Sequence, residues 1–265
     1  MELRPIFDPD EKGRPMRVAA FMSGSGTNII KLIEKEKGLV EENGASPFNV
    51  VFLFSDRSDG ECRGEEIALE YGIPYFSYDI RKFHQIRNIK RTALTPEGLS
   101  ARKEFDRTAK RLIDAFDVDI IALGGYMSYT TLNGCVNVHP ADLSIQSSDG
   151  KRKYVGDHAV RDAIVAGETT LRSSTLWTDQ GVDTGPLLMV SGPVEVQLPE
   201  SVDRLVKDRK ELSAVVDRNQ DRLKEAGDWK IFPRTIELIS LGRFSLDKGF
   251  NVYLDQKPVP DGYRE

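Results

Sequence analysis

The sequence is poor in the residues that disulfides and metal sites need. Its 265 residues include only two cysteines, Cys62 and Cys135, and three histidines, His84, His139 and His158. Two cysteines make neither a disulfide framework nor a CxxC metal site, and no HExxH or similar ligand spacing occurs. We therefore expect a mechanism without a metal, and we interpret Cys135, which lies in an apolar stretch, as a small core residue.

Long hydrophobic runs and clustered positive charge are also absent. No stretch approaches the roughly 20 apolar residues that a membrane-spanning helix needs, and the acidic N-terminal segment lacks the apolar region of a signal peptide. The net charge of −5 and the pI near 5.5 argue against a nucleic-acid partner, because neutralising phosphates needs clustered Lys and Arg. The basic run 81–91 is interpreted as solvated surface. We expect a cytoplasmic protein that acts on small molecules, with no nucleic-acid or membrane partner.

Apolar runs suited to strands alternate along the chain with amphipathic stretches suited to helices. Strands are predicted at 16–22, 49–54, 74–78, 118–123 and 134–138, and helices at 29–37, 61–71, 99–116 and 158–165. This alternation predicts an α/β fold with a twisted, mostly parallel sheet. Ligands of such sheets bind outside the carboxyl ends of the strands.

Two segments show no clear period. Residues 79–97 are interpreted as a surface excursion and residues 141–156 as a long loop. The C-terminal part predicts a strand pair at 170–178 and 186–196, and helices at 202–224 and 229–241. We divide the chain into a leader (1–16), one domain (17–243) and a C-terminal tail (244–265) that is interpreted as a hairpin.

A glycine-rich turn, Ser-Gly-Ser-Gly-Thr-Asn at 23–28, follows the first predicted strand and opens a helix. Backbone N–H groups and the helix dipole favour an anion at such a place. We interpret Gly24, Gly26, Thr27 and Asn28 as a phosphate site, with a plain tight turn as the structural alternative. The turn lacks the Walker lysine, and Asn28 stands near where a dinucleotide fingerprint has its third glycine, which weakens a nucleotide-cofactor interpretation.

Asn137 and His139 have the same strand parity and lie just before Pro140, which ends the strand. A histidine at a strand end is by itself more typical of a structural residue. The acidic turn at Asp183 changes this interpretation, because amide, imidazole and carboxylate together suit acyl transfer. The amide can polarise a carbonyl, and the imidazole, oriented by the carboxylate, can transfer a proton.

Three segments together resemble the formyltetrahydrofolate-dependent formyltransferases: SGSGTN at 23–28, DIIALGGYM at 119–127, and NVHP at 137–140 followed by GVDTGP at 181–186. The resemblance spans about residues 17–241 and is greatest to the glycinamide ribonucleotide formyltransferases of purine synthesis. It implies a three-layer Rossmann-like formyltransferase fold with helices on both faces of the sheet. It also implies transfer of a formyl group from 10-formyltetrahydrofolate, a co-substrate, to the primary amine of glycinamide ribonucleotide through a tetrahedral intermediate.

The resemblance implies a role for each matching position. Asn137 would polarise the formyl carbonyl, while His139 and Asp183 would handle the proton that passes from the amine to the folate nitrogen. Asp228 would anchor the acceptor amine. The residues implied to contact the folate are Arg102 near its tail, Leu123, Tyr126 and Met127 in the pocket wall, and Thr178 and Val182 in the loop over the pterin.

The sequence departs from the family pattern at two site positions. Ser128 stands where the family has an arginine, and Leu176 where it has a histidine. Segments 79–97 and 141–155 are also longer than in the family. These departures leave open the strength of folate binding and the acceptor, for which an amino-sugar nucleotide is an alternative. A dinucleotide-binding oxidoreductase and a non-catalytic ligand sensor are alternatives from other classes, and the oligomeric state is open between a monomer and a homodimer.

Overall fold

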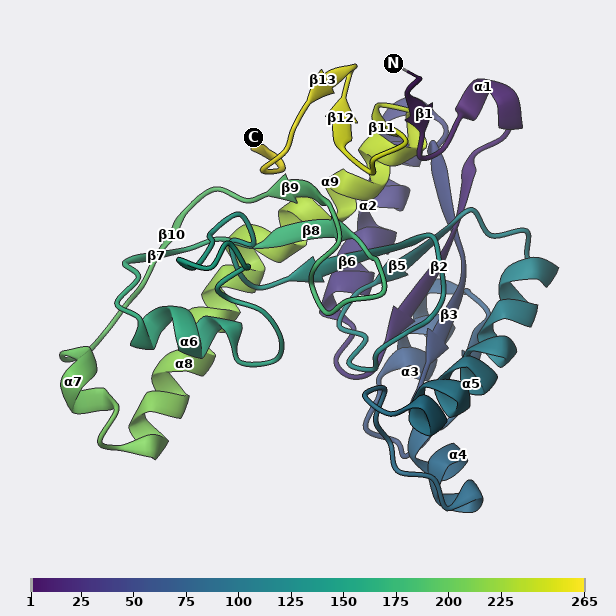
Figure 1. The fold of residues 1–265 in the computed structure, drawn as a ribbon. Helices are drawn as coiled ribbons and strands as arrows, with labels where there is room; N and C mark the ends of the chain where they lie inside the picture. Colours follow the sequence, from purple (N-terminus) through teal and green to yellow (C-terminus); the bar gives the residue numbers. More distant parts are fainter. Residues whose placement is uncertain (1, 265) are drawn as a thin grey trace. The chain divides into compact units, whose positions relative to one another are not determined.

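The computed structural model describes residues 2–264 and divides into two compact units (Figure 1). One unit holds residues 7–137, and the other holds residues 138–264 together with residues 2–6. Strand β6 (Cys135–His139) carries the chain from the first unit into the second. Strands and helices alternate in both units, so the predicted α/β fold is confirmed.

A parallel sheet forms the core of the unit at 7–137. Its strands lie in the order β6-β5-β2-β3-β4, and each neighbouring pair is parallel. Their bounds are Met16–Met22 for β2, Phe48–Ser55 for β3, Tyr75–Ser77 for β4 and Ile120–Leu123 for β5. All residues of β2 except Arg17 are buried, which is the burial expected of a parallel strand covered on both faces. The five strands predicted from apolar runs are confirmed within two residues at each end.

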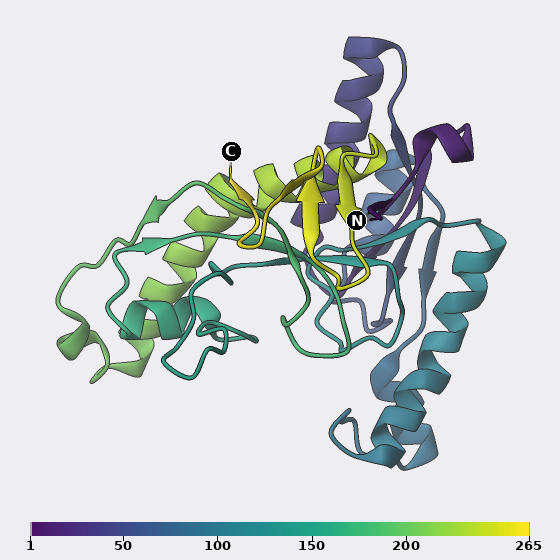
Figure 2. The same cartoon turned by 45° about the horizontal axis from the view of Figure 1, so that its top comes forward.

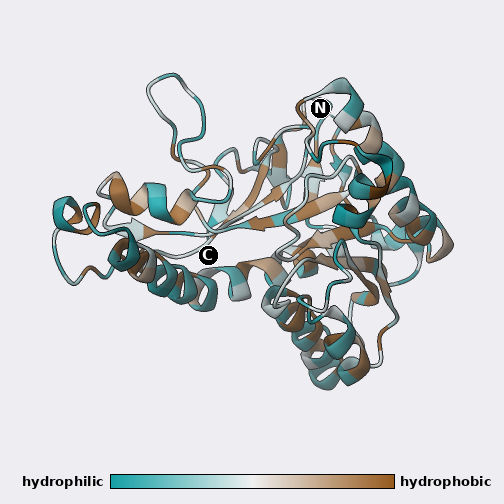
Figure 3. Ribbon diagram, turned by 90° about the horizontal axis from the view of Figure 1, so that it is seen from below, coloured by the Kyte–Doolittle hydropathy of each residue, from teal (hydrophilic) through white to brown (hydrophobic). Residues whose placement is uncertain are grey.

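Five helices belong to this unit, and short capping signals fix their ends. They are α1 (Pro9–Lys12), α2 (Thr27–Asn43), α3 (Gly64–Tyr71), α4 (Ile80–Arg87) and α5 (Pro96–Ala115). Thr95 caps α5 by accepting a hydrogen bond from the Gly98 N–H at 3.1 Å, and Gly72 ends α3 with a left-handed φ of 70°. Figure 3 shows hydrophobic residues concentrated in the strands, whereas the helices carry both hydrophobic and hydrophilic residues.

The segment 79–97, interpreted as a surface excursion without a clear period, contains helix α4. Asp79 caps this helix by accepting hydrogen bonds from the N–H groups of Arg81 and Lys82, both at 2.9 Å. Phe83 is buried on α4 and packs edge-on against Phe105 of α5 at 5.4 Å. A helix of eight residues with few apolar positions shows little hydrophobic periodicity. Its basic residues therefore indicated an exposed surface segment rather than a helix.

Strand pairs organise the unit at 138–264. Strand β8 (Ser174–Trp177) is antiparallel to β9 (Leu187–Val190), and β7 (Thr170–Leu171) is antiparallel to β10 (Val194–Glu195). The strand pair predicted across the 178–186 turn is therefore confirmed. Strand β14 (Tyr263–Arg264) adds to β9 in parallel.

Helices α6 (Ala159–Val165), α7 (Val202–Leu205), α8 (Arg209–Leu223) and α9 (Trp229–Ser240) belong to the same unit. A π-helical turn, Lys224–Asp228, joins α8 to α9, and Figures 1 and 2 show the two as one continuous helix. Such turns shift the direction of side chains and are frequent at functional sites. Asp228, one of the predicted site residues, is the last residue of this turn.

A small antiparallel sheet contains strands β11 to β13 of the C-terminal tail. Its order is β1 (Arg4–Pro5), β11 (Phe244–Leu246), β12 (Val252–Leu254) and β13 (Lys257–Pro258). The turn between β11 and β12 is held by Asp247, which accepts hydrogen bonds from the Gly249 and Asn251 N–H groups at 2.8 and 2.9 Å. The division into leader, domain and tail stays a prediction.

Among residues 2–264, none of the helices has the combination of length and apolar content needed to cross a bilayer.

Candidate functional site

Strand β6 carries two of the three residues predicted to act in catalysis. Asn137 and His139 lie two residues apart on it and therefore share a face. Asn137 is half-buried, whereas His139 is only 5% exposed. Because the strand ends at His139, its imidazole lies at the carboxyl end of a parallel strand, where α/β sheets place their ligands.

The structure brings His139 and Asp183 together. Nδ1 of the imidazole lies 3.4 Å from Oδ2 of the carboxylate, and Nε2 lies 3.0 Å from the backbone oxygen of Tyr154. A carbonyl oxygen can only accept, so Nε2 is the donor in that contact and Nδ1 is the nitrogen that faces Asp183. Both ring nitrogens therefore have a partner, which fixes the orientation of the ring.

Asp183 is held in an unusual backbone conformation. Its φ of 54° lies in the left-handed region, which residues other than glycine seldom adopt. The Gly156 N–H donates to its Oδ2 at 2.8 Å, and the Arg152 guanidinium donates to its backbone oxygen. Backbone strain of this kind costs about 1–3 kcal/mol and tends to occur at functional sites.

Three supporting residues, Arg152, Tyr154 and Gly156, were missed from the sequence. All lie in the segment 141–156, which the sequence indicated only as a long loop. Tyr154 and Gly156 contribute backbone atoms, which every residue type can supply, so no pattern of side chains could have identified them.

The predicted phosphate loop lies between β2 and α2 in the unit at 7–137. Gly26 is buried with a φ of 68°, and a Cβ there would lie 2.3 Å from Cε of Met22, so a side chain at this position would strain the backbone and displace Met22. No side chain caps the start of α2, and no acidic residue lies in its first turn. The N–H groups at this helix start are therefore available to an anion. Gly24, Thr27 and Asn28 are half-buried around this loop.

The predicted folate-contact residues of the same unit are mostly buried. Leu123 is 5% and Tyr126 8% exposed, whereas Met127 is 66% exposed. Arg102 is only 4% exposed, and its guanidinium donates to Tyr126 Oη at 2.9 Å and pairs with Asp106 at 2.8 Å. Burial raises the pKa of the Tyr126 hydroxyl above its ordinary value, so Tyr126 accepts from Arg102 as a neutral phenol. The structure thus joins Arg102 and Tyr126, two of the predicted folate-contact residues, by a hydrogen bond.

Asp228 is also buried, at 4% exposure. The Ser173 hydroxyl donates a hydrogen bond to its Oδ1. The preceding Gly227 packs against the same hydroxyl, because a Cβ at this position would lie 2.6 Å from Ser173 Oγ. Ser173 was also missed from the sequence, because it lies just before strand β8 and 55 positions before Asp228.

The turn predicted to cover the pterin is stabilised by hydrogen bonds between its own residues. Asp179 accepts hydrogen bonds from the Gly181 N–H at 2.9 Å and from Thr184 Oγ1 at 2.6 Å. Thr178 is half-buried and Val182 is 58% exposed. Leu176, where the family has a histidine, is buried in an apolar cluster with Leu143, Leu187 and Val190.

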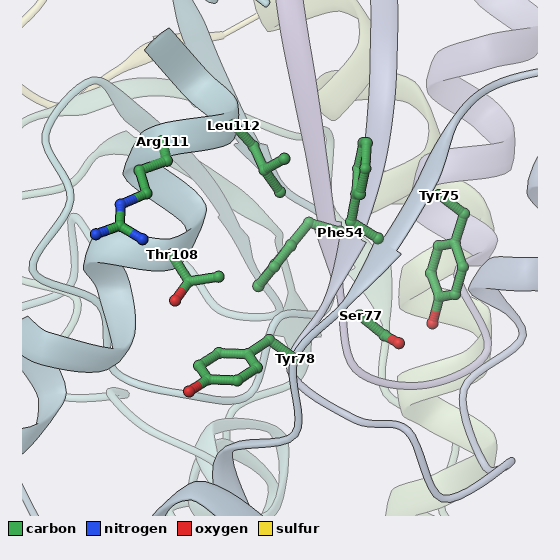
Figure 4. Close-up of a pocket in the computed structure, with 8 residues that line it drawn as sticks. Phe54, Tyr75, Ser77, Tyr78, Thr108, Arg111 and Leu112 are labelled. Atoms are coloured by element: carbon green, nitrogen blue, oxygen red, sulfur yellow. The ribbon is translucent and has the colours of Figure 1, made fainter. Parts of the chain in front are cut away.

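A surface pocket of about 430 Å³ lies beside the edge strand β4 (Figure 4). Thr108, Arg111 and Leu112 of α5 line one side, and residues on and after β4, among them Tyr75 and Tyr78, line the other. None of the predicted site residues lines it. We therefore place the candidate site by the hydrogen-bonded residues above. Residues 2–264 contain no group of three or more His, Cys, Asp or Glu that could hold a metal ion.

Known proteins match most of this chain. Residues 16–215 match the family described as formyl transferase. The trifunctional purine biosynthetic protein adenosine-3 of Drosophila melanogaster is 25% identical over 236 residues, which are 86% of this chain and 14% of that protein. The chain thus spans about a seventh of the length of that relative.

Solved structures show the same fold. The phosphoribosylglycinamide formyltransferase of Coxiella burnetii has a TM-score of 0.65 at 22% identity, covering 95% of this chain and 99% of that one. The glycinamide ribonucleotide transformylase 1 of Symbiobacterium toebii has a TM-score of 0.64 at 23% identity, covering 91% and 95%. A formyltetrahydrofolate deformylase of Pseudomonas syringae has a TM-score of 0.59 at 15% identity, covering 91% and 66%.

Proposed function

We propose, since this chain belongs to the formyl transferase family, that it transfers a formyl group from 10-formyltetrahydrofolate to the primary amine of glycinamide ribonucleotide. The observation that carries the proposal is the buried pair of His139 and Asp183. Asn137 precedes His139 by two residues on the same strand. The names of the relatives from Drosophila, Coxiella and Symbiobacterium support a purine-pathway acceptor. The family match favours this activity over a dinucleotide-binding oxidoreductase.

The reaction needs one bond made, one bond broken and one proton moved. The amine nitrogen attacks the formyl carbon, and the carbonyl oxygen becomes an oxyanion in a tetrahedral intermediate. The side-chain amide of Asn137 donates a hydrogen bond to that oxygen. A donor placed where negative charge develops contributes about 3–4 kcal/mol to such a step.

The second half of the reaction releases tetrahydrofolate. The bond between the formyl carbon and N10 breaks, and the proton lost by the attacking amine passes to N10. Asp183 accepts and returns this proton, while His139, oriented through its two nitrogen contacts, stabilises charge beside it. No covalent intermediate with the protein is required, and no metal is needed for any step.

The remaining predicted residues are assigned to the two substrates. Gly24, Gly26, Thr27 and Asn28 bind the phosphate of the acceptor at the start of α2, and Asp228 binds its amine. The folate lies against Leu123, Tyr126 and Met127, with Thr178 and Val182 over the pterin. Arg102 acts through the Tyr126 hydroxyl that it contacts.

The proposal is tested by incubating the purified protein with 10-formyltetrahydrofolate and each of three acceptors: glycinamide ribonucleotide, an amino-sugar nucleotide, and water alone. Product is followed by mass spectrometry and tetrahydrofolate release by absorbance. We expect a formylated product with glycinamide ribonucleotide only. Binding of both ligands without any formylated product would contradict the transferase, and product with the amino-sugar nucleotide alone would replace the acceptor. Cytoplasmic localisation and the choice between monomer and homodimer stay predictions.

A further inference from the structure

Asp56 is a buried carboxylate that none of the predicted roles uses. It follows β3 directly and is 3% exposed. The Ser23 hydroxyl donates to its Oδ1 at 2.6 Å, and the Ser128 hydroxyl donates to its Oδ2. Burying a carboxylate is costly unless hydrogen bonds compensate for the lost water. The two serines supply this compensation, so the three residues form one unit, here called the Ser-Asp-Ser bridge.

The Ser-Asp-Ser bridge joins the ends of three neighbouring strands. Ser23 follows β2, Asp56 follows β3, and Ser128 lies in the loop after β5. These strands are adjacent in the order β5-β2-β3. Since parallel strands end at the same edge of a sheet, the bridge lies along the ligand-binding edge of the unit at 7–137.

Further hydrogen bonds to the backbone connect the loop after β2 with the loop after β5. Ser23 Oγ accepts a hydrogen bond from the Met127 N–H at 2.9 Å, and the Ser23 N–H donates to the backbone oxygen of Gly125 at 3.1 Å. The Ser23 hydroxyl thus donates to Asp56 while accepting from Met127. Removing Asp56 would release the hydroxyl that holds the Met127 backbone.

The two loops joined by the bridge have different assigned ligands. Ser23 begins the predicted phosphate loop, and Ser128 directly follows Tyr126 and Met127 of the predicted folate wall. We infer that Asp56 is a positioning residue that sets the folate wall against the phosphate loop through Ser128 and Ser23, an inference that rests on the proposed function. Ser128 stands where the family has an arginine. In this protein its hydroxyl bonds to Asp56 and so holds the loop after β5 in place.

The inference predicts a separation of KM from kcat. In Ser128→Ala the folate wall loses one hydrogen bond to a charged group, and we expect the KM for 10-formyltetrahydrofolate to rise about 3- to 10-fold. The kcat and the KM for the acceptor should change by less than about twofold, because Ser23 keeps its bond to Asp56. In Asp56→Ala both loops lose their anchor, so both KM values should rise.

Asp56→Asn is the conservative comparison. An amide can accept from one serine hydroxyl and donate to the other, so this variant should recover most of the affinity that Asp56→Ala loses. A role limited to stability would lower the unfolding temperature without separating the two KM values. If Asp56→Ala does not fold, Ser128→Ala and Asp56→Asn still provide the comparison.

Ser46→Ala is the matched control at the opposite end of β3. Ser46 is also buried, and its hydroxyl bonds to the backbone oxygen and N–H of Phe48 at 2.7 and 3.3 Å. The Ser46→Ala variant should lose stability as Ser128→Ala does. Its KM values for 10-formyltetrahydrofolate and for the acceptor should both stay unchanged.

The experiment measures KM, kcat and unfolding temperature for all variants, together with the Kd for tetrahydrofolate by calorimetry. Unchanged folate KM and Kd in folded Ser128→Ala would overturn the inference alone. Equal effects in Ser46→Ala and Ser128→Ala would also overturn it. A wild-type protein that neither binds tetrahydrofolate nor transfers formyl would overturn the proposed function and this inference with it.

Discussion

Oδ2 of Asp183 lies 3.4 Å from Nδ1 of His139 and 2.8 Å from the Gly156 N–H. One carboxylate oxygen thus faces both an imidazole from strand β6 and a backbone donor from the loop at 141–156. Both side chains of the pair are less than a tenth exposed, so water does not replace either contact easily. The geometry of the candidate catalytic pair therefore depends on the loop as much as on the strand.

We expect Asp183→Asn to lower kcat by about 10²- to 10⁴-fold, because the amide cannot accept the proton that passes from amine to folate. The fold should survive, since the amide oxygen still accepts from Gly156. Steady-state kinetics and thermal unfolding measure the two effects. Asp255→Asn, in the C-terminal sheet, is the control and should keep its turnover. A kcat near that of the wild type would remove Asp183 from the proton path.

Two glycines of the 141–156 loop offer a matched comparison. Gly150 and Gly156 have φ values of 76° and 74°, and a Cβ at either would meet no atom within 4 Å. Substitution by alanine should cost each about 1–2 kcal/mol of stability through left-handed backbone strain. Only Gly156→Ala should also lower kcat, because relaxation of the strained backbone there would move the N–H that donates to Asp183. Chemical denaturation and initial rates test this, and equal kcat in the two variants would contradict it.

The contact between Ser173 and Asp228 should affect the acceptor more than the folate. Ser173→Ala removes a buried hydroxyl donor to a carboxylate, and we expect about 1–3 kcal/mol of lost stability. If Asp228 binds the acceptor amine, the KM for the acceptor should rise while the folate KM stays constant. Ser240→Ala is the control, because Ser240 is a buried serine of α9 whose hydroxyl donates to the Glu237 backbone oxygen rather than to a predicted site residue. A rise in the folate KM alone would argue against this role.

The stability of the unit at 7–137 should depend on pH through His84. Burial lowers the pKa of its imidazole below the ordinary value, with the bond to the Ile89 backbone oxygen acting in the opposite direction. The folded state therefore binds a proton less readily than the unfolded state. The contribution of neutral His84 to the unfolding free energy is fully present above the pKa of the unfolded state, which is about 6.5. It is lost as the pH falls from there through the lower pKa of the folded state.

Urea unfolding at pH 7.5 and pH 5 measures this dependence. We expect His84→Gln to show a smaller decrease in unfolding free energy between the two pH values than the wild type. The exposed His158, replaced in the same way, is the control and should leave the decrease unchanged. An identical decrease in His84→Gln and wild type would assign the pH dependence to other groups.

Most of the parallel sheet could be predicted because its signals are local. A continuous apolar run such as residues 16–22 is buried on both faces, and burial in a parallel sheet requires that composition. The glycine-rich turn at 23–28 was also recognisable from its composition, and Gly26 in it adopts a left-handed φ of 68°. His139 and Asp183 were recognised by residue type and position, and the structure then placed them together.

Other features depend on partners that are distant in the sequence. Helix α4 is stabilised by Phe105 of another helix, and Asp228 is bound by a serine 55 residues earlier. Two supports of His139 and Asp183 are backbone groups of Tyr154 and Gly156, which a pattern of side chains does not reveal. Local composition and periodicity thus established the strands, the glycine turn and the reactive residue types. Folding alone brought distant hydroxyls, carbonyls and N–H groups within hydrogen-bond reach, because tertiary contacts are not encoded by neighbours in the chain.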